Sequence, residues 1–144
     1  MSPQKKAIEL ILNFIEDKLG YTIETAGLPV GGGLSAEAQA AKDNGTTLDR
    51  QRQDRTLPLL ILSKNKIQGV AMEQLFNIGN LISRATKLPQ DECVQLMSAT
   101  VSTDAATVGK VGDFWIYSMI VDVRIAFSVS YTHLRAHETV LDLV

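Results

Sequence analysis

The chain has 144 residues, of which 45% are hydrophobic and 21% charged, and its formal net charge is -2. This length is sufficient for one domain with a hydrophobic core. The balanced charge excludes a global basic field that would make nucleic acid the main partner. The single cysteine, Cys93, excludes an internal disulfide framework and indicates a reducing compartment. With no base beside it in the sequence, Cys93 is interpreted as an inert thiol.

The N-terminal segment predicts an amphipathic helix over residues 3 to 19, which Gly20 ends. Polar residues interrupt its apolar face, so the segment has neither the apolar region of a signal peptide nor the length of a membrane span. We therefore expect a soluble protein made in a cytoplasm, with no membrane partner. The apolar residues that recur at helical spacing are Ile8, Ile11, Leu12, Ile15 and Leu19.

A short strand is expected over residues 21 to 25, and three consecutive glycines follow at residues 31 to 33. The glycines lack the Gly-Lys-Ser/Thr ending of a phosphate-binding loop and the strand-to-helix setting of a dinucleotide fingerprint. They therefore predict a flexible or sharply bent backbone, because glycine adopts dihedral angles that are closed to other residues. No cofactor is expected.

Residues 35 to 56 are the least core-like part of the chain, with Leu48 the only large apolar residue. Arginines alternate there with Asp49 and Asp54. The segment is predicted to be a long polar arm, and two interpretations stay open: a solvated loop, or an arm that orders against a neighbouring subunit or lines a channel.

Residues 57 to 63 form an apolar run that predicts a buried strand. Pro58 is expected near the beginning of that strand or at an edge. A helix is predicted from about residue 70 to residue 88, where Pro89 ends it. Gly79 within this helix indicates the close approach of another element. The helix stripe expected to face the core comprises Met72, Leu75, Phe76, Gly79 and Ile82.

Two further strands are expected over residues 94 to 102 and 115 to 127, joined by a hairpin loop over residues 104 to 113. In the last strand, alternate residues from Trp115 to Phe127 are apolar, which predicts one buried face. The element order indicates a single α+β domain, with a mostly antiparallel sheet and two main helices packed on one face.

The run from Val129 to Thr139 resembles one reading frame of the transposase adapter used in sequencing-library preparation. We therefore expect a domain over residues 1 to 128 and an artefactual tail over residues 129 to 144. Both histidines, His133 and His137, lie in this tail. Their spacing could serve a metal pair on a helix, but we interpret it as part of the appended peptide. Without them, histidine-dependent catalysis is unavailable, and no catalytic or metal-binding residue is predicted.

Three stretches of the chain resemble a family of small proteins from tailed phages and prophages, the phage minor capsid proteins. They are residues 28 to 34, residues 49 to 66 without residues 51 to 54, and residues 115 to 123. The similarity spans nearly all of residues 1 to 127. The expected element order is also similar to that of tail terminator proteins from long-tailed phages.

The resemblance implies a structural virion protein at the head–tail junction rather than an enzyme. Such a protein would form a homo-oligomeric ring, expected to be hexameric, that caps the tail tube. Its partners would be the tail tube protein and the head connector protein, and DNA would pass through the lumen without sequence readout. It would be assembled in the bacterial host cytoplasm and located in the virion.

The same resemblance makes six charged residues candidates for subunit contacts or for the lining of the lumen. A solvated charged face is the alternative interpretation of these residues. The candidates are Asp49, Arg50, Arg52, Arg55, Lys64 and Lys66.

Two other functions are considered. One is a small transferase or hydrolase that uses Asp49 and Asp54 with Arg50 or Arg55. Paired carboxylates need a pocket that raises the pKa of one of them, and the sequence indicates no such pocket. The other is an interaction domain outside the virion.

Overall fold

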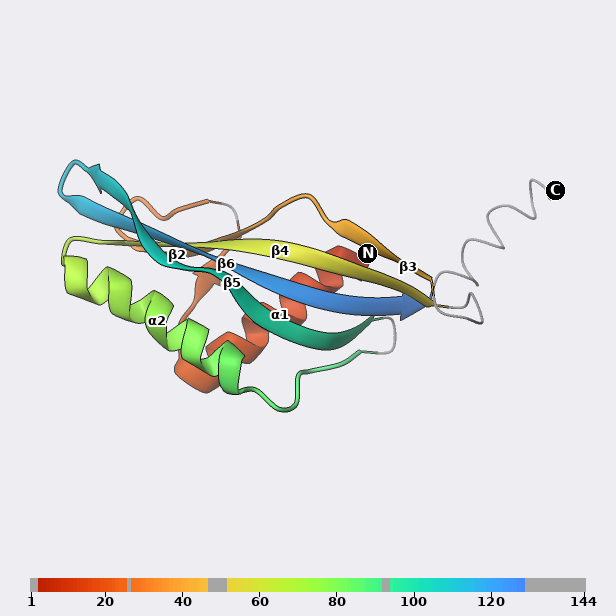
Figure 1. Ribbon diagram of the computed structural model, residues 1–144. Coiled ribbons are helices and arrows are strands. Elements are labelled where there is room, and N and C mark those ends of the chain that lie inside the picture. The colour runs from red at the N-terminus through yellow and green to blue at the C-terminus, as the bar shows by residue number, and fades with distance from the viewer. Residues whose placement is uncertain (1–2, 26, 47–51, 92–93, 129–144) are drawn as a thin grey trace.

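A computed structural model describes residues 3–128 with the exception of residues 26, 47–51 and 92–93. One twisted sheet forms a layer, and both helices cover the same face of it (Figure 1). This arrangement confirms the predicted single-domain α+β fold. The elements are α1 (Pro3–Leu19), β1 (Ile23–Glu24), β2 (Gly33–Ala38), β3 (Lys42–Thr46), β4 (Arg52–Asn65), α2 (Gln68–Arg84), β5 (Val94–Val111) and β6 (Phe114–Ser128).

The sheet has the strand order β1-β2-β4-β6-β5, and β3 also pairs with β4. Among the described strands only β1 and β2 pair in parallel, so the predicted mostly antiparallel sheet is confirmed. The centre of the sheet is the pair β4 and β6, which stays in register from Arg52 opposite Ser128 to Asn65 opposite Trp115. Strand β5 forms one edge of the sheet.

The core lies between this sheet and the two helices. Successive side chains of a strand point to opposite faces. Alternate residues of β4 from Leu57 to Ser63 and of β6 from Tyr117 to Phe127 are buried on the helix side, whereas Trp115 is partly buried. The alternation predicted for residues 115 to 127 is therefore confirmed from residue 117 onward. Fully buried side chains of the core include Ile11, Ile15, Leu59, Ile61, Leu75, Ile78, Met119, Val121, Val123 and Ile125.

Helix α1 has the predicted bounds, whereas α2 ends four residues earlier than predicted. Ala85 already has extended dihedral angles, φ -67° and ψ 120°. The chain leaves the helix there, and Leu88 packs partly buried against the core. Pro89 therefore lies beyond the end of the helix and does not determine where the helix ends.

The prediction that Met72 and Phe76 face the core is wrong, because 49% and 58% of these residues are exposed. Leu75 and Ile82 are buried as predicted, and Ala71 and Ile78 complete the buried stripe of α2. Each next residue along an α-helix is rotated by about 100°, which carries Met72 and Phe76 onto the flank of the helix.

Gly79 faces another element, the sheet, but the approach there is of ordinary van der Waals contact and does not require glycine. A Cβ atom at this position would lie 3.5 Å from Met119 Sδ and 3.6 Å from Val101 Cγ2.

The predicted polar arm over residues 35 to 56 is mostly strand, so this prediction is wrong. Strands β2 and β3 follow one another along the same edge of β4, and residues 52 to 56 are the beginning of β4. Leu34, Ser35 and Ala36 are buried. Small and polar residues carry no period-two signal, so pairing with β4 decides their structure.

Pro58 lies in the middle of the central strand β4, although the sequence predicts a place near the strand beginning or at an edge. Its carbonyl oxygen accepts a hydrogen bond of 2.9 Å from the Gln39 backbone N–H. The missing N–H of Pro58 therefore faces the same side, where the neighbouring strand is interrupted between Ala38 and Lys42. The break between β2 and β3 thus lies where proline cannot donate.

The hairpin loop predicted over residues 104 to 113 is also largely strand. Strand β5 continues to Val111, and the turn comprises Gly112 and Asp113. Several register shifts interrupt the pairing of β5 with β6, one of them between Thr107 and Gly109. These bulges accommodate the small polar residues that favoured a loop in the sequence.

Several predictions fall outside the described residues: those on Cys93, and on the tail over residues 129 to 144. In the part of the chain that the structure does describe, neither helix has the length and apolar character needed to cross a membrane.

Candidate functional site

The six charged candidates do not form one cluster. Arg55 lies near the beginning of β4, whereas Lys64 lies near its end and Lys66 just beyond it. Nine residues of extended strand separate Arg55 from Lys64, roughly 30 Å at about 3.3 Å per residue. The described candidates therefore belong to opposite ends of the sheet. Asp49 and Arg50 lie outside the described residues, and Arg52 is described by its backbone in β4.

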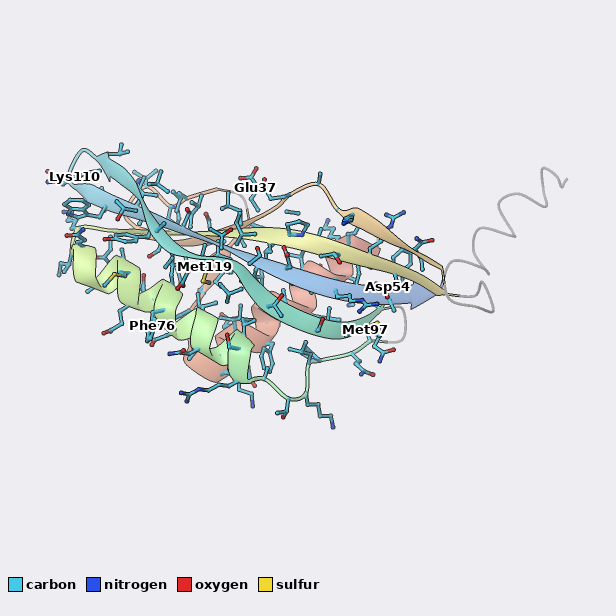
Figure 2. The ribbon with its side chains drawn as sticks, viewed as in Figure 1. Glu37, Asp54, Phe76, Met97, Lys110 and Met119 are labelled. Carbon is cyan, nitrogen blue, oxygen red and sulfur yellow. The ribbon has the colours of Figure 1, made fainter. Side chains whose placement is uncertain are left out.

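Lys64 and Lys66 belong to a cluster that we call the basic end, defined as Lys64, Lys66, Lys110, Phe114 and Trp115. The ammonium groups of Lys64 and Lys66 lie 4.7 Å and 5.6 Å from the centre of the Phe114 ring. The Lys110 ammonium lies 5.5 Å from the Trp115 ring. Figure 2 shows Lys110 at the tip of the β5–β6 hairpin, far from Asp54.

The two aromatic residues of the basic end are adjacent in β6, so their rings point to opposite faces of the sheet. Each ring holds at least one lysine by a cation–π contact, which contributes about 0.5 to 1 kcal/mol at an exposed site. A lysine ammonium that lies over a ring still has N–H donors for a second partner. The basic end can therefore bind anionic groups on both faces of the sheet.

The glycine-rich turn closes over the basic end, and here the predicted sharp bend is confirmed. Gly32 has φ +99°, and a Cβ atom at this position would lie 3.1 Å from the Lys64 carbonyl oxygen. It would also lie 3.3 Å from Phe114 Cε1. The Lys64 ammonium donates to the Val30 carbonyl oxygen at 3.3 Å. The glycines thus permit close backbone packing against a lysine and an aromatic ring.

Sequence reasoning missed Lys110 and Phe114 as members of this cluster. Gly112 and Asp113 form a tight turn between two strands, and a two-residue hairpin turn places the flanking residues opposite each other. Val111 indeed pairs with Phe114, and Lys110 with Trp115. The sequence predicts a loop over residues 104 to 113. A prediction of a two-residue turn instead would have placed Lys110 beside Trp115.

At the other end of the sheet, the Arg55 guanidinium lies over the Phe127 ring at 5.6 Å. Its Nε is buried and has no hydrogen-bond partner among the residues that the structure describes. Asp54 precedes Arg55 in β4. Both of its carboxylate oxygens accept hydrogen bonds from Arg124, the shortest of 2.7 Å. These hydrogen bonds and the charge of Asp54 raise the pKa of Arg124. The Asp54 carboxylate thus acts in a strand-to-strand ion pair.

A third surface was not recognised from the sequence: the flank of α2 that carries Met72 and Phe76, beside the edge strand β5. We call it the α2–β5 flank. Phe76 and Gly79 from α2 and Val101 and Asp104 from β5 line a shallow groove there. Strand β5 ends the strand order, so beyond its bridge from Gln95 to Gln90 the outer side of its backbone pairs with no other strand of the described sheet.

Within the described residues, no three side chains of the His, Cys, Asp or Glu types come together to hold a metal ion.

A comparison with protein-family models finds no match for this chain, and a comparison with curated proteins finds no significant relative.

Proposed function

We propose that this protein is a structural virion component of a tailed phage or prophage that acts at the head–tail junction. In this proposal it forms a homo-oligomeric ring that caps the tail tube and joins it to the head. The observation that carries the proposal is the α2–β5 flank, where Met72 and Phe76 are exposed beside an unpaired strand edge. The resemblance of residues 28 to 34, 49 to 50, 55 to 66 and 115 to 123 to phage minor capsid proteins supplies the context.

An exposed apolar flank beside a free strand edge is suited to contact with another subunit. Burying apolar surface contributes about 25 cal/mol per Å², which favours covering Met72 and Phe76 in an assembly. A free edge can accept backbone hydrogen bonds from a neighbour. If this flank meets a different surface of the next copy, the contact is heterologous and generates a ring when the rotation closes.

The basic end is the part of the protein that we assign to the lumen or to a neighbouring acidic surface. Ammonium groups attract DNA phosphates without reading bases, as a channel for DNA requires. Lys64 and Lys66 belong there, whereas Arg55 lies at the opposite end of β4. The lumen is thus assigned to Lys64 and Lys66, and the subunit contact to the α2–β5 flank, which contains none of the six charged candidates.

The test in vivo is electron microscopy of a lysate after deletion of the gene from a prophage that encodes the protein. We expect DNA-filled heads separate from unjoined tails of irregular, excessive length. Tails of normal length beside heads that leak or fail to join would move the protein to the head side of the junction. Intact, infectious particles would contradict a structural role in the virion.

The test in vitro is the mass of the purified protein measured by light scattering, with Phe76→Ser as the variant. We expect a closed oligomer for the wild type and smaller species for the variant. A wild type that stays monomeric at high concentration would contradict the proposed ring.

A further inference from the structure

The C-terminal ends of α1 and α2 lie side by side (Figure 1). Residues of both helix ends and residues 85 to 89 line an open groove there. Apolar side chains that are only partly buried form its floor. A floor of this kind can still bury an apolar side chain of a ligand. The floor residues are Phe14, Leu81, Ala85, Leu88 and Pro89.

The rim of the groove carries three cationic side chains, Lys18, Arg84 and Lys87, and one carboxylate, Asp17. None of the three cations forms an ion pair with the described part of the chain. Lys18 and Arg84 lie in the last turns of their helices, where a cation also interacts favourably with the helix dipole. Lys87 lies beyond both helices, so interaction with a helix dipole does not explain a cation at this position.

We propose that this groove binds an acidic peptide segment of a partner protein, with an apolar side chain on the floor and carboxylates against the cationic rim. Charge complementarity favours this occupant, because the rim carries three cations against one carboxylate and none of these cations forms an ion pair with the described residues. The guanidinium of Arg84 suits a carboxylate, which it can bind through two parallel hydrogen bonds. The floor is mainly aliphatic and therefore suits a leucine-sized side chain better than a nucleic-acid backbone.

This inference does not depend on the proposed function. Leu81 faces the groove between the helix ends, whereas Gly79, Asn80 and Ser83 line the groove beside β5. The two grooves thus lie on different flanks of α2. Loss of one interaction is therefore distinguishable from loss of the other.

The experiment uses the full chain and a fluorescein-labelled peptide of alternating glutamate and leucine pairs, with binding followed by anisotropy. Two further peptides replace all glutamates by lysine or all leucines by serine. The protein variant is the double substitution Arg84→Glu and Lys87→Glu. The matched control is Lys42→Glu, an exposed lysine on β3 that lies outside the groove.

We expect the glutamate–leucine peptide to bind, with an affinity about tenfold lower for the double variant and unchanged for the control. Both substituted peptides should bind at least about tenfold more weakly, because one lacks the carboxylates for the rim and the other lacks the apolar side chains for the floor. Nuclear magnetic resonance of the wild type should show peptide-induced shifts around residues 14 to 18 and 81 to 89. This measurement does not rely on a variant that folds.

Absence of binding by the wild type, or shifts confined to other regions, would overturn the proposal. Equal binding of the serine peptide would also overturn it, since the apolar floor would then play no part. A single-stranded DNA probe that binds more tightly than the peptide, and that the double variant weakens, would reassign the groove to a nucleic acid.

Discussion

Arg124 of β6 binds Asp54 of β4 through both carboxylate oxygens, with N···O distances of 3.0, 3.1 and 2.7 Å. The two residues lie diagonally across the pair of central strands, since Asp54 is opposite Ala126 and Arg124 opposite Thr56. The ion pair therefore links the strands near the Arg55 end of the sheet. It also occupies the carboxylate that the enzyme hypothesis requires.

Replacing Arg124 by Gln should lower the melting temperature slightly, because half of the Arg124 side chain is exposed and surface ion pairs are weak. The pKa of Arg124 is raised, so its charge is present below the ordinary arginine pKa and is lost only above the raised one. The difference from the wild type should therefore stay constant between about pH 6 and pH 10. Thermal melts at several pH values and salt concentrations check this; a difference that grows with salt would contradict it.

Leu75 and Phe76 are neighbours in α2 but should respond in opposite ways to truncation. Leu75 is fully buried, so Leu75→Ala should lower the free energy of unfolding by about 2 to 5 kcal/mol. Phe76 is 58% exposed, so Phe76→Ser should change monomer stability by about 0.5 kcal/mol at most. Urea unfolding of both variants under monomeric conditions measures the contrast. Similar losses for both would show that Phe76 belongs to the monomer core.

Gly32 and Gly31 form a second matched pair, in the turn that closes over the basic end. Gly32→Ala should destabilise the protein by about 1 to 2 kcal/mol, because φ is +99° and the new Cβ approaches the Lys64 carbonyl oxygen. Gly31→Ala should have little effect, since nothing lies within 4 Å of its added Cβ. The midpoints of denaturant unfolding of the two variants measure this difference in stability. Equal midpoints would contradict the close packing at Gly32.

Substitutions of Pro58 and Leu60 test why the neighbour of β4 is interrupted between β2 and β3. The backbone of Leu60 points to the same side as that of Pro58, where Glu37 of β2 lies opposite it. Leu60→Pro should cost about 3 kcal/mol or more because it removes a sheet hydrogen bond. Pro58→Ala should change the stability by about 1 kcal/mol or less. Circular dichroism melts compare the two; a large loss for Pro58→Ala would indicate that proline itself fixes the strand.

The sequence by itself determined the elements whose apolar residues repeat with a clear period. Helix α1 has the predicted bounds, and alternate residues of β6 from Tyr117 to Phe127 are buried as predicted. The class of fold followed from these elements. Local periodicity is sufficient here because each element buries one face, and the apolar residues of that face recur at a regular spacing along the sequence.

Only the tertiary structure decided the extent of the sheet, the rotation of α2 and the grouping of the charged residues. Strands β2, β3 and the outer half of β5 are held by pairing with β4 and β6, and small polar residues carry no sign of such pairing. The apolar stripe of α2 is wide enough to include Met72 and Phe76, and packing against the sheet selected Leu75 and Ile78. Lys64 and Lys110 are far apart in sequence, and they share one end of the sheet because strand register sets which residues meet.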